Sequence, residues 1–165
     1  MHRLRSFVRQ RAAAFDPVDL NAEVAAVLAL ADLDARNHDT RLVLDLAPEV
    51  PAVAADAIQI QQVILNLVRN AIDATAHLES ARRVVTIATR ALADGLVEVR
   101  VSDPGPGVAP AAIEQIFNPF FTTKSAGMGL GLSISHTIIE SHGGRLWHEP
   151  NNPQGAVFSL RLPVT

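Results

Sequence analysis

A two-layer sandwich of the α/β (α+β) class, with helices on one face of a mixed sheet, is the fold that this sequence predicts. Three observations lead to it. The chain has 165 residues, which is enough for one domain to bury a core without disulfides. Hydrophobic residues make up 48% and charged residues 19%, a composition typical of globular domains. Segments with helical periodicity and segments with strand periodicity follow one another along the chain without internal repeats.

The N-terminal part of the chain predicts two helices and a strand. A short amphipathic stripe within residues 1–14 indicates the end of a helix that belongs to an element outside this domain. Asp19 is expected to cap the next helix, which runs to about Arg36. Residues 40–46 alternate apolar and polar side chains, as a half-buried strand does.

The longest periodic segment runs from Asp56 to about Leu78 and predicts the main helix, because its apolar residues repeat at helical spacing. The remaining patterns predict strands at 84–89 and 97–101, a short helix at 110–116, a helix from about Gly129 to Ser141, and closing strands at 145–148 and 156–162.

Composition excludes several classes of function. The chain has no cysteine, which rules out thiol catalysis, cysteine-ligated zinc and iron–sulfur clusters. Its net charge of −3 is spread over mixed signs, so we expect no nucleic-acid partner. No apolar run approaches the roughly 20 residues that cross a bilayer, and the charged start does not lead into a signal peptide. We therefore expect a cytoplasmic domain that makes no membrane contact.

The main helix carries a second, polar stripe, in which Gln59, Gln62, Asn66, Asn70 and Asp73 share one face. Asparagine is disfavoured in helix interiors, because its side chain competes for backbone hydrogen bonds. From these residues alone two interpretations remain open: a face exposed to solvent, or the polar wall of a ligand site. An asparagine carbonyl is a hard oxygen ligand that suits Mg²⁺, which keeps water and phosphate oxygens as its other ligands.

A glycine- and proline-rich turn follows a hydrophobic strand at residues 103–108. Its glycines allow the backbone to turn tightly and to approach a ligand. The carboxylate of Asp103, at the strand end, is suited to accept a hydrogen bond from an exocyclic amine. An ordinary Asp-Pro-Gly turn has the same sequence, so the turn alone does not define a site.

Three glycines at alternate positions, Gly127, Gly129 and Gly131, run directly into a helix. Backbone N–H groups at such a helix start, together with the helix dipole, favour a phosphate group. The spacing fits neither a Walker loop nor a dinucleotide-binding fingerprint. Upstream, the segment Thr122–Lys124 adds two hydroxyl groups and an ammonium group.

In combination these segments resemble the catalytic and ATP-binding (HATPase) domain of sensor histidine kinases, in the gyrase, Hsp90, histidine kinase and MutL (GHKL) superfamily. Gln61–Ala74 resembles the N box, Asp103–Val108 the first glycine box, Ile116–Lys124 the F box, and Gly127–Ser135 the second glycine box. The C-terminal part is similar to FixL-like and NtrB-like kinases. The resemblance covers residues 16–163 and implies the Bergerat ATP-binding fold.

The resemblance implies a role for each motif residue. Asn70 would supply an oxygen to Mg²⁺, and Asp103 would accept a hydrogen bond from the adenine amino group. Asn66, Asn70 and Lys124 would act in catalysis. The complete set implied to contact ATP is Asn66, Arg69, Asn70, Asp73, Asp103, Gly105, Gly107, Val108, Thr122, Thr123, Lys124, Gly127, Gly129, Leu130, Gly131 and Leu132.

One position carries a prediction about the reaction. ATPases of the superfamily tend to have a glutamate, one turn before the metal-binding asparagine, that takes a proton from water. Asn66 stands at that place, and an amide cannot act as a general base. Hydrolysis should therefore be slow, which leaves ATP available for transfer of its γ-phosphoryl group to a histidine.

The phosphate-accepting histidine is expected to lie outside this chain. Only His38 and His148 precede an acidic residue, as acceptor histidines commonly do, and neither lies in a predicted exposed helix. Both are expected at the surface. Residues 1–14 would then be the end of a dimerisation-domain helix or a linker, and residues 15–165 the catalytic domain. Its implied partners are ATP, the dimerisation and histidine-phosphotransfer domain of the same or a partner kinase, and a response regulator receiver domain.

Two alternatives remain at this stage. A serine kinase of the anti-sigma-factor type shares the nucleotide-binding fold, although the F box argues against it. The other is a non-catalytic nucleotide-binding or docking module, which would keep the nucleotide pocket but would not transfer a phosphoryl group.

Overall fold

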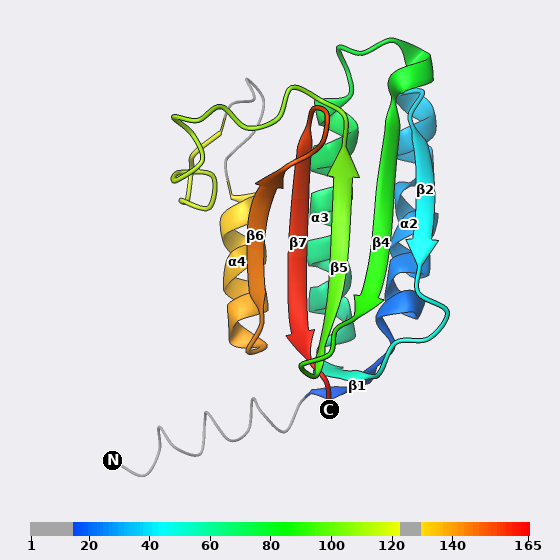
Figure 1. Cartoon of the computed structure of the whole chain (residues 1–165), viewed down its shortest axis with the longest axis vertical. Coiled ribbons are helices and arrows are strands. Elements are labelled where there is room, and N and C mark those ends of the chain that lie inside the picture. Colours follow the sequence, from blue (N-terminus) through cyan, green and yellow to red (C-terminus); the bar gives the residue numbers. More distant parts are fainter. Residues whose placement is uncertain (1–14, 123–129) are drawn as a thin grey trace.

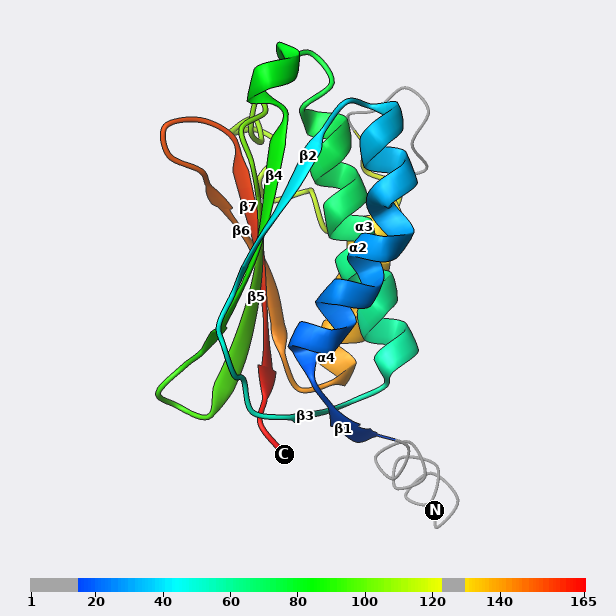
Figure 2. The ribbon, with the colours of Figure 1, turned by 90° about the vertical axis from the view of Figure 1, so that its right-hand side faces the viewer.

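The structure, a computed structural model, describes residues 15–122 and 130–165. It contains a five-stranded mixed sheet in the order β2-β4-β5-β7-β6 and a small two-stranded sheet, β1-β3. Figure 1 shows the large sheet face on, and Figure 2 shows that the helices α2, α3 and α4 all lie on one side of it. The predicted two-layer sandwich is confirmed. The helical stripe predicted within residues 1–14 lies outside the described residues.

The strands of the large sheet are β2 (Arg41–Leu46), β4 (Val84–Ala91), β5 (Leu96–Asp103), β6 (Arg145–Pro150) and β7 (Ala156–Pro163). Strand β2 pairs with β4 in parallel, and the other neighbours are antiparallel. Each of these strands was predicted, and the predicted ends lie close to the observed ones. The sequence did not predict the three-residue strands β1 (Asp16–Val18) and β3 (Val53–Ala55), because so short a segment shows no periodicity.

The two long helices start close to their predicted first residues, and an aspartate caps each of them. Helix α2 (Leu20–Asn37) is capped by Asp19, whose Oδ1 accepts from the N–H of Asn21 at 2.9 Å. Helix α3 (Ala57–Ala74) is capped by Asp56, which accepts from the N–H groups of Ile58 and Gln59. The third helix, α4, spans Gly131–Ser141.

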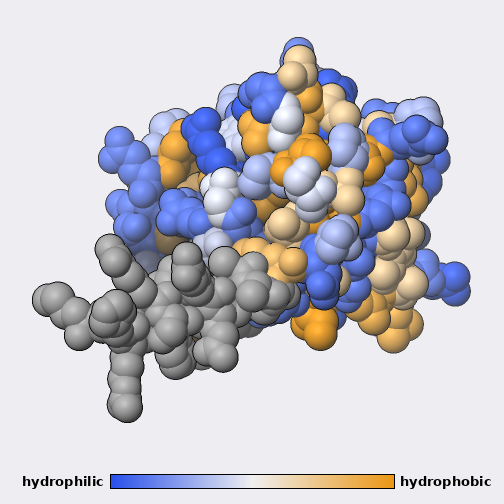
Figure 3. Space-filling model, turned by 90° about the horizontal axis from the view of Figure 1, so that it is seen from below, coloured by the Kyte–Doolittle hydropathy of each residue, from blue (hydrophilic) through white to orange (hydrophobic). Residues whose placement is uncertain are grey.

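The core lies between the sheet and the helices. The buried residues of α2 and α3 recur at helical spacing, and the strands contribute every second residue. Residues predicted to face inward, such as Leu20, Val27, Ile64 and Leu67, are at most 1% exposed. Seen from the end where α3 begins, the surface mixes hydrophilic and hydrophobic side chains (Figure 3). None of the described helices combines the length and the apolar character that a membrane span requires.

The open face of the sheet is covered by its own long side chains. The indole of Trp147 lies near the guanidinium groups of Arg145 and Arg161, which are 5.1 and 4.7 Å from the ring centroid. Arg161 also donates to the Glu98 carboxylate at 2.9 Å. These side chains leave Ser159, on β7 opposite Trp147, only 1% exposed. No helix is therefore needed to shield the centre of this face.

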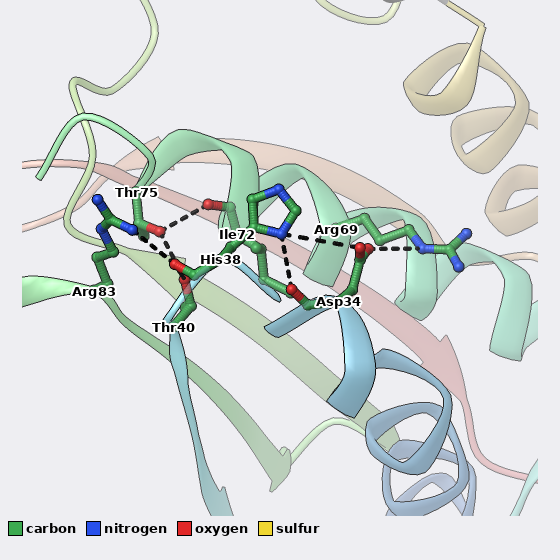
Figure 4. A network of polar contacts seen from close by, with 7 residues as sticks. All are labelled: Asp34, His38, Thr40, Arg69, Ile72, Thr75 and Arg83. Carbon is green, nitrogen blue, oxygen red and sulfur yellow. Dashed lines mark hydrogen bonds and ion pairs between the residues drawn. The ribbon is translucent and has the colours of Figure 1, made fainter. Parts of the chain in front are cut away.

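Helix α3 ends at Ala74, four residues earlier than its periodicity predicts. Figure 4 shows the polar network at this end, where Arg83 reaches back toward the turn after the helix. Its guanidinium donates to the carbonyl oxygens of Ala76, Leu78 and His38 at 3.2, 2.9 and 2.8 Å. Because a helix leaves its last carbonyls without intrahelical partners, a fixed cation there stabilises the turn. Arg83 thereby joins the ends of α2 and α3.

We expect replacement of Arg83 by methionine to lower the free energy of unfolding by about 2–3 kcal/mol, since hydrogen bonds from a charged group to three carbonyl oxygens are lost. Urea denaturation followed by circular dichroism measures this. Arg82→Met is the matched control, because the neighbouring Arg82 is exposed. Equal stability of the two variants would show that the contacts of Arg83 contribute nothing.

Candidate functional site

Asp103 is the last residue of β5 and is only 3% exposed. Its Oδ1 accepts from the N–H of Gly105 at 2.8 Å. Burial raises the pKa of this carboxyl group above its ordinary value, and hydrogen bonds from the backbone of Gly105 and Ala156 partly oppose that rise. A carboxylate held in such a place costs stability, and this makes it a candidate for a binding role.

The turn after Asp103 passes close to the end of α3. A Cβ atom at Gly105 would lie 2.5 Å from the Ala74 carbonyl oxygen and 2.9 Å from Asp103 Oδ1, so only glycine fits. Gly107 has φ +75°, in the left-handed region that favours glycine. Val108 is partly buried against the core. The glycines at 105 and 107 are thus required by the structure of the turn itself.

The turn is supported by residues that sequence reasoning did not single out. Asn151 Nδ2 donates to the Asp103 carbonyl oxygen at 2.9 Å. Gly155 approaches the same carbonyl so closely that a Cβ atom would lie 1.8 Å from the oxygen. Both belong to the loop between β6 and β7, which the sequence marks as a turn. No pattern in the sequence predicts that this loop contacts residue 103.

The polar stripe of α3 divides into two parts. Gln62 and Asp73 are exposed, whereas Asn66 and Asn70 are half-buried. Asn66 Nδ2 donates to Ser135 Oγ of α4 at 3.3 Å. The solvent-exposed interpretation therefore holds for Gln62 and Asp73, while Asn66 lies toward α4.

Arg69 lies on the other side of α3, next to α2. Its Nε is 3.4 Å from the Asp34 carboxylate, and Figure 4 shows this ion pair between the two helices. His38, the cap of α2, is 4.0 Å from the same carboxylate and bonds the Asp34 carbonyl oxygen through Nδ1. The structure thus brings Arg69 together with α2 and not with α4.

Helix α4 presents its first turn to this region. The chain enters it at Leu130, which makes no side-chain capping bond. The first N–H groups of a helix lack intrahelical partners, and they favour an anion. Leu130 and Leu132 are half-buried, and Thr122 is exposed. Thr123, Lys124, Gly127 and Gly129, which the sequence places in this site, lie outside the described residues.

The segment between the turn and α4 corrects one prediction. No helix forms at 110–116; instead, hydrogen bonds of the i→i−3 kind start at Ala112, Gln115 and Asn118. Since these bonds recur only at every third residue, the continuous i→i−4 ladder of an α-helix does not develop. Of the two neighbouring phenylalanines in this segment, Phe121 packs against the core, whereas Phe120 is 71% exposed with φ +64°.

Neither histidine with an acidic neighbour lies on the exposed face of a helix. The side chain of His38 is 41% exposed at the end of α2, consistent with the surface position expected. His148 is half-buried on β6, with its ring 5.3 Å from Phe158. Burial lowers the pKa of His148, and the charge of Glu149 opposes the shift. His148 therefore lies only partly at the surface.

The end of β5, the end of α3 and the start of α4 all lie toward the upper end of Figure 1. No group of three or more histidine, cysteine or acidic side chains within the described part of the chain could hold a metal ion alone. Mg²⁺ does not require such a group, because one amide oxygen completed by phosphate oxygens and water suffices. Asn70 fits that requirement, because its side chain carries an amide oxygen.

The comparisons with known proteins agree with this geometry. Residues 55–165 match the family described as histidine kinase-, DNA gyrase B-, and HSP90-like ATPase. The chain is 43% identical to the sensor protein FixL of Bradyrhizobium diazoefficiens over 164 residues, which cover 99% of this chain and 32% of FixL. It thus spans about a third of the length of that relative.

Solved structures give the same result. The catalytic domain of histidine kinase ThkA superposes with a TM-score of 0.79 and 36% identity, covering 90% of this chain and 95% of that domain. ThkA in complex with the response regulator protein TrrA superposes with a TM-score of 0.77 and 32% identity over 99% of this chain and 48% of that one. Full-length ShkA in complex with AMPPNP superposes with a TM-score of 0.78 and 29% identity, covering 91% of this chain and 31% of the ShkA chain.

Proposed function

Because the chain belongs to the family of histidine kinase-, DNA gyrase B- and HSP90-like ATPases, as the domain type found in sensor histidine kinases, we propose that it binds Mg-ATP and transfers the γ-phosphoryl group to a histidine of a dimerisation domain. One observation carries the proposal most strongly. The Asp103 carboxylate is buried, at a cost in stability, beside a turn that only glycine can form.

In this proposal the adenine amino group donates a hydrogen bond to Asp103, beside the turn of Gly105, Gly107 and Val108. The phosphates lie at the start of α4, where backbone N–H groups of residues 130–132 face them. Thr122, Thr123, Lys124, Gly127 and Gly129 extend this phosphate site. Asp73 shares a face of α3 with Asn70 and completes its polar surroundings, whereas Arg69 is held by Asp34 beside α2.

Asn70 would hold Mg²⁺, which when bound neutralises phosphate charge. A nitrogen of the acceptor histidine attacks the γ-phosphorus in line, the bond between that phosphorus and the bridging oxygen breaks, and ADP leaves. The domain contributes position and charge rather than covalent chemistry. Since Asn66 cannot take a proton from water, competing hydrolysis remains slow.

The partners follow from the same proposal. The acceptor histidine belongs to a dimerisation domain, of the same or a partner kinase, and a response regulator receiver domain takes the phosphoryl group onward. Support comes from ThkA, whose structure was solved with a response regulator. We place the working domain in the cytoplasm, where ATP is available.

Calorimetric titration with ADP and AMPPNP, with and without Mg²⁺, is the first test. We expect saturable binding of both nucleotides, and tighter binding of AMPPNP when Mg²⁺ is present, because Asn70 would hold a metal ion that neutralises phosphate charge. A folded sample that binds neither nucleotide would contradict the proposal and favour a docking module.

The acceptor is identified by the chemistry of the product. With a histidine-containing bundle of a relative as substrate, the transferred phosphate should be lost in acid and kept in base, as a phosphoramidate is. An acid-stable product would instead identify a serine kinase.

A further inference from the structure

Asn66 joins α3 to the first turns of α4. Its Nδ2 donates to the hydroxyl oxygen of Ser135 at 3.3 Å. Ser135 is 2% exposed, so this hydroxyl lies between the helices and away from solvent. A buried hydroxyl without a partner costs free energy, and the bond to Asn66 removes that cost.

The same amide fills the space of a missing side chain at Gly131. A Cβ atom there would lie 2.4 Å from Asn66 Oδ1, 3.0 Å from its Cγ and 3.1 Å from its Nδ2. These three atoms, all from one residue, are the nearest neighbours of that position. Gly131 is the first residue of α4 and is not among the glycines with positive φ. A side chain at residue 131 would therefore meet the Asn66 amide first, and that amide would have to move to make room for it.

This arrangement directs the Asn66 amide toward α4. Its nitrogen donates to Ser135, and its oxygen is the atom that a side chain at residue 131 would meet first. Asn70 lies one turn further along α3 on the same helix face, but none of its atoms is among those nearest to a side chain at residue 131. Of the two asparagines, Asn66 is therefore the one whose side chain lies nearest to the position of a side chain at residue 131.

We propose that Asn66 is a positioning residue, which fixes the start of α4 relative to Asn70 through Ser135 and Gly131. The inference rests on the proposed function, because the start of α4 is where the phosphates of ATP would bind. It replaces the catalytic role suggested for Asn66 by the family motif. The hydrogen bond to Ser135 and the close approach to Gly131 both connect the Asn66 amide to the start of α4.

A double-mutant cycle tests the steric contact. Gly131→Ala should weaken AMPPNP binding about tenfold or more, because its methyl group displaces the Asn66 amide and with it the start of α4. Asn66→Ala should weaken binding about fivefold, the value of one ordinary hydrogen bond. In the double variant, Gly131→Ala should add no further loss, since the shortened side chain leaves room for the methyl group.

Ser135→Ala tests the hydrogen bond. We expect about fivefold weaker AMPPNP binding, with the same fold-change whether Mg²⁺ is present or absent, because no metal ligand is removed. Ser141→Ala is the matched control. Its hydroxyl bonds the Ile138 carbonyl oxygen within α4, far from the start of the helix, so affinity should not change. Thermal unfolding of each variant shows that it is folded.

Two results would overturn the positioning role. One is a loss from Gly131→Ala that stays the same when Asn66→Ala is already in place. The other is an unchanged affinity in Ser135→Ala while Asn66→Ala loses binding only when Mg²⁺ is present, which would make Asn66 a metal ligand. Both presuppose that the unaltered chain binds AMPPNP; failure of that binding would contradict the proposed function itself.

Discussion

Replacing Asp103 by asparagine is expected to weaken adenine nucleotide binding roughly 10- to 100-fold, because a hydrogen bond to a charged acceptor contributes about 1.5–3 kcal/mol. The new amide keeps an oxygen for the N–H of Gly105. Its nitrogen, however, would face the adenine amino group with a donor opposite a donor. Titration with ADP measures the loss.

The stability of the same variant should depend less on pH than that of the unaltered chain. Burial raises the pKa of Asp103, so the folded state binds its proton more tightly than the unfolded state does. From this group alone, the free energy of unfolding falls as the pH rises from the unfolded-state pKa through the raised folded-state pKa. Asp103→Asn removes this contribution. The free energy of unfolding of the variant should therefore fall less than that of the unaltered chain as the pH rises between these two pKa values.

Asp45→Asn provides the matched control, since Asp45 is an exposed strand carboxylate on β2. Neither affinity nor stability should respond to it. Titration with GDP adds a second readout: an asparagine nitrogen can donate to the guanine carbonyl oxygen, so the preference for ADP over GDP should narrow in Asp103→Asn alone. If Asp103→Asn lowers the stability but leaves the nucleotide affinity unchanged, Asp103 has a structural role and does not recognise adenine.

Local sequence signals predicted most of the fold. Asp19 and Asp56 could be identified as the starts of helices, because capping depends on residues only two or three positions away. The early end of α3 could not be predicted, since it depends on Arg83, which lies beyond the helix and bonds the turn between them. The strands β1 and β3 pair with each other although α2 lies between them in the chain. Segments of three residues carry no sequence pattern that predicts this pairing.

The candidate site divides in the same way. Asn70, Asp103 and the glycines could be found because they form compact motifs. The contacts that hold them could not: Asn151 lies 48 residues from Asp103, and Ser135 lies 69 residues from Asn66. Long-range contacts of this kind depend on how the helices pack on the sheet. They also separate residues that a motif groups together, since only Asn66 of the two motif asparagines fills the gap at residue 131.

Asn70→Ala should remove the Mg²⁺ dependence of nucleotide binding and lower phosphoryl transfer by roughly 100-fold or more, because metal stabilisation of phosphate charge contributes several kcal/mol. Binding of ADP without Mg²⁺ should change little, since adenine recognition at Asp103 is untouched. The fold should persist, because alanine is a better helix former than asparagine by about 0.6 kcal/mol. Calorimetry with and without Mg²⁺, followed by transfer to a histidine-containing bundle, measures both effects.

Gln62→Ala distinguishes the metal-binding role from a general effect of the polar stripe. Gln62 lies on the same face of α3, nearer its start, and is exposed, so its loss should alter neither Mg²⁺ dependence nor transfer. The contrast with Asn66→Ala is equally informative, because a positioning residue lowers affinity by the same factor in both conditions, whereas a metal ligand lowers it only when the metal is present. If Asn70→Ala binds AMPPNP with the full Mg²⁺ enhancement, the metal is held elsewhere, and Asn70 has no part in the reaction.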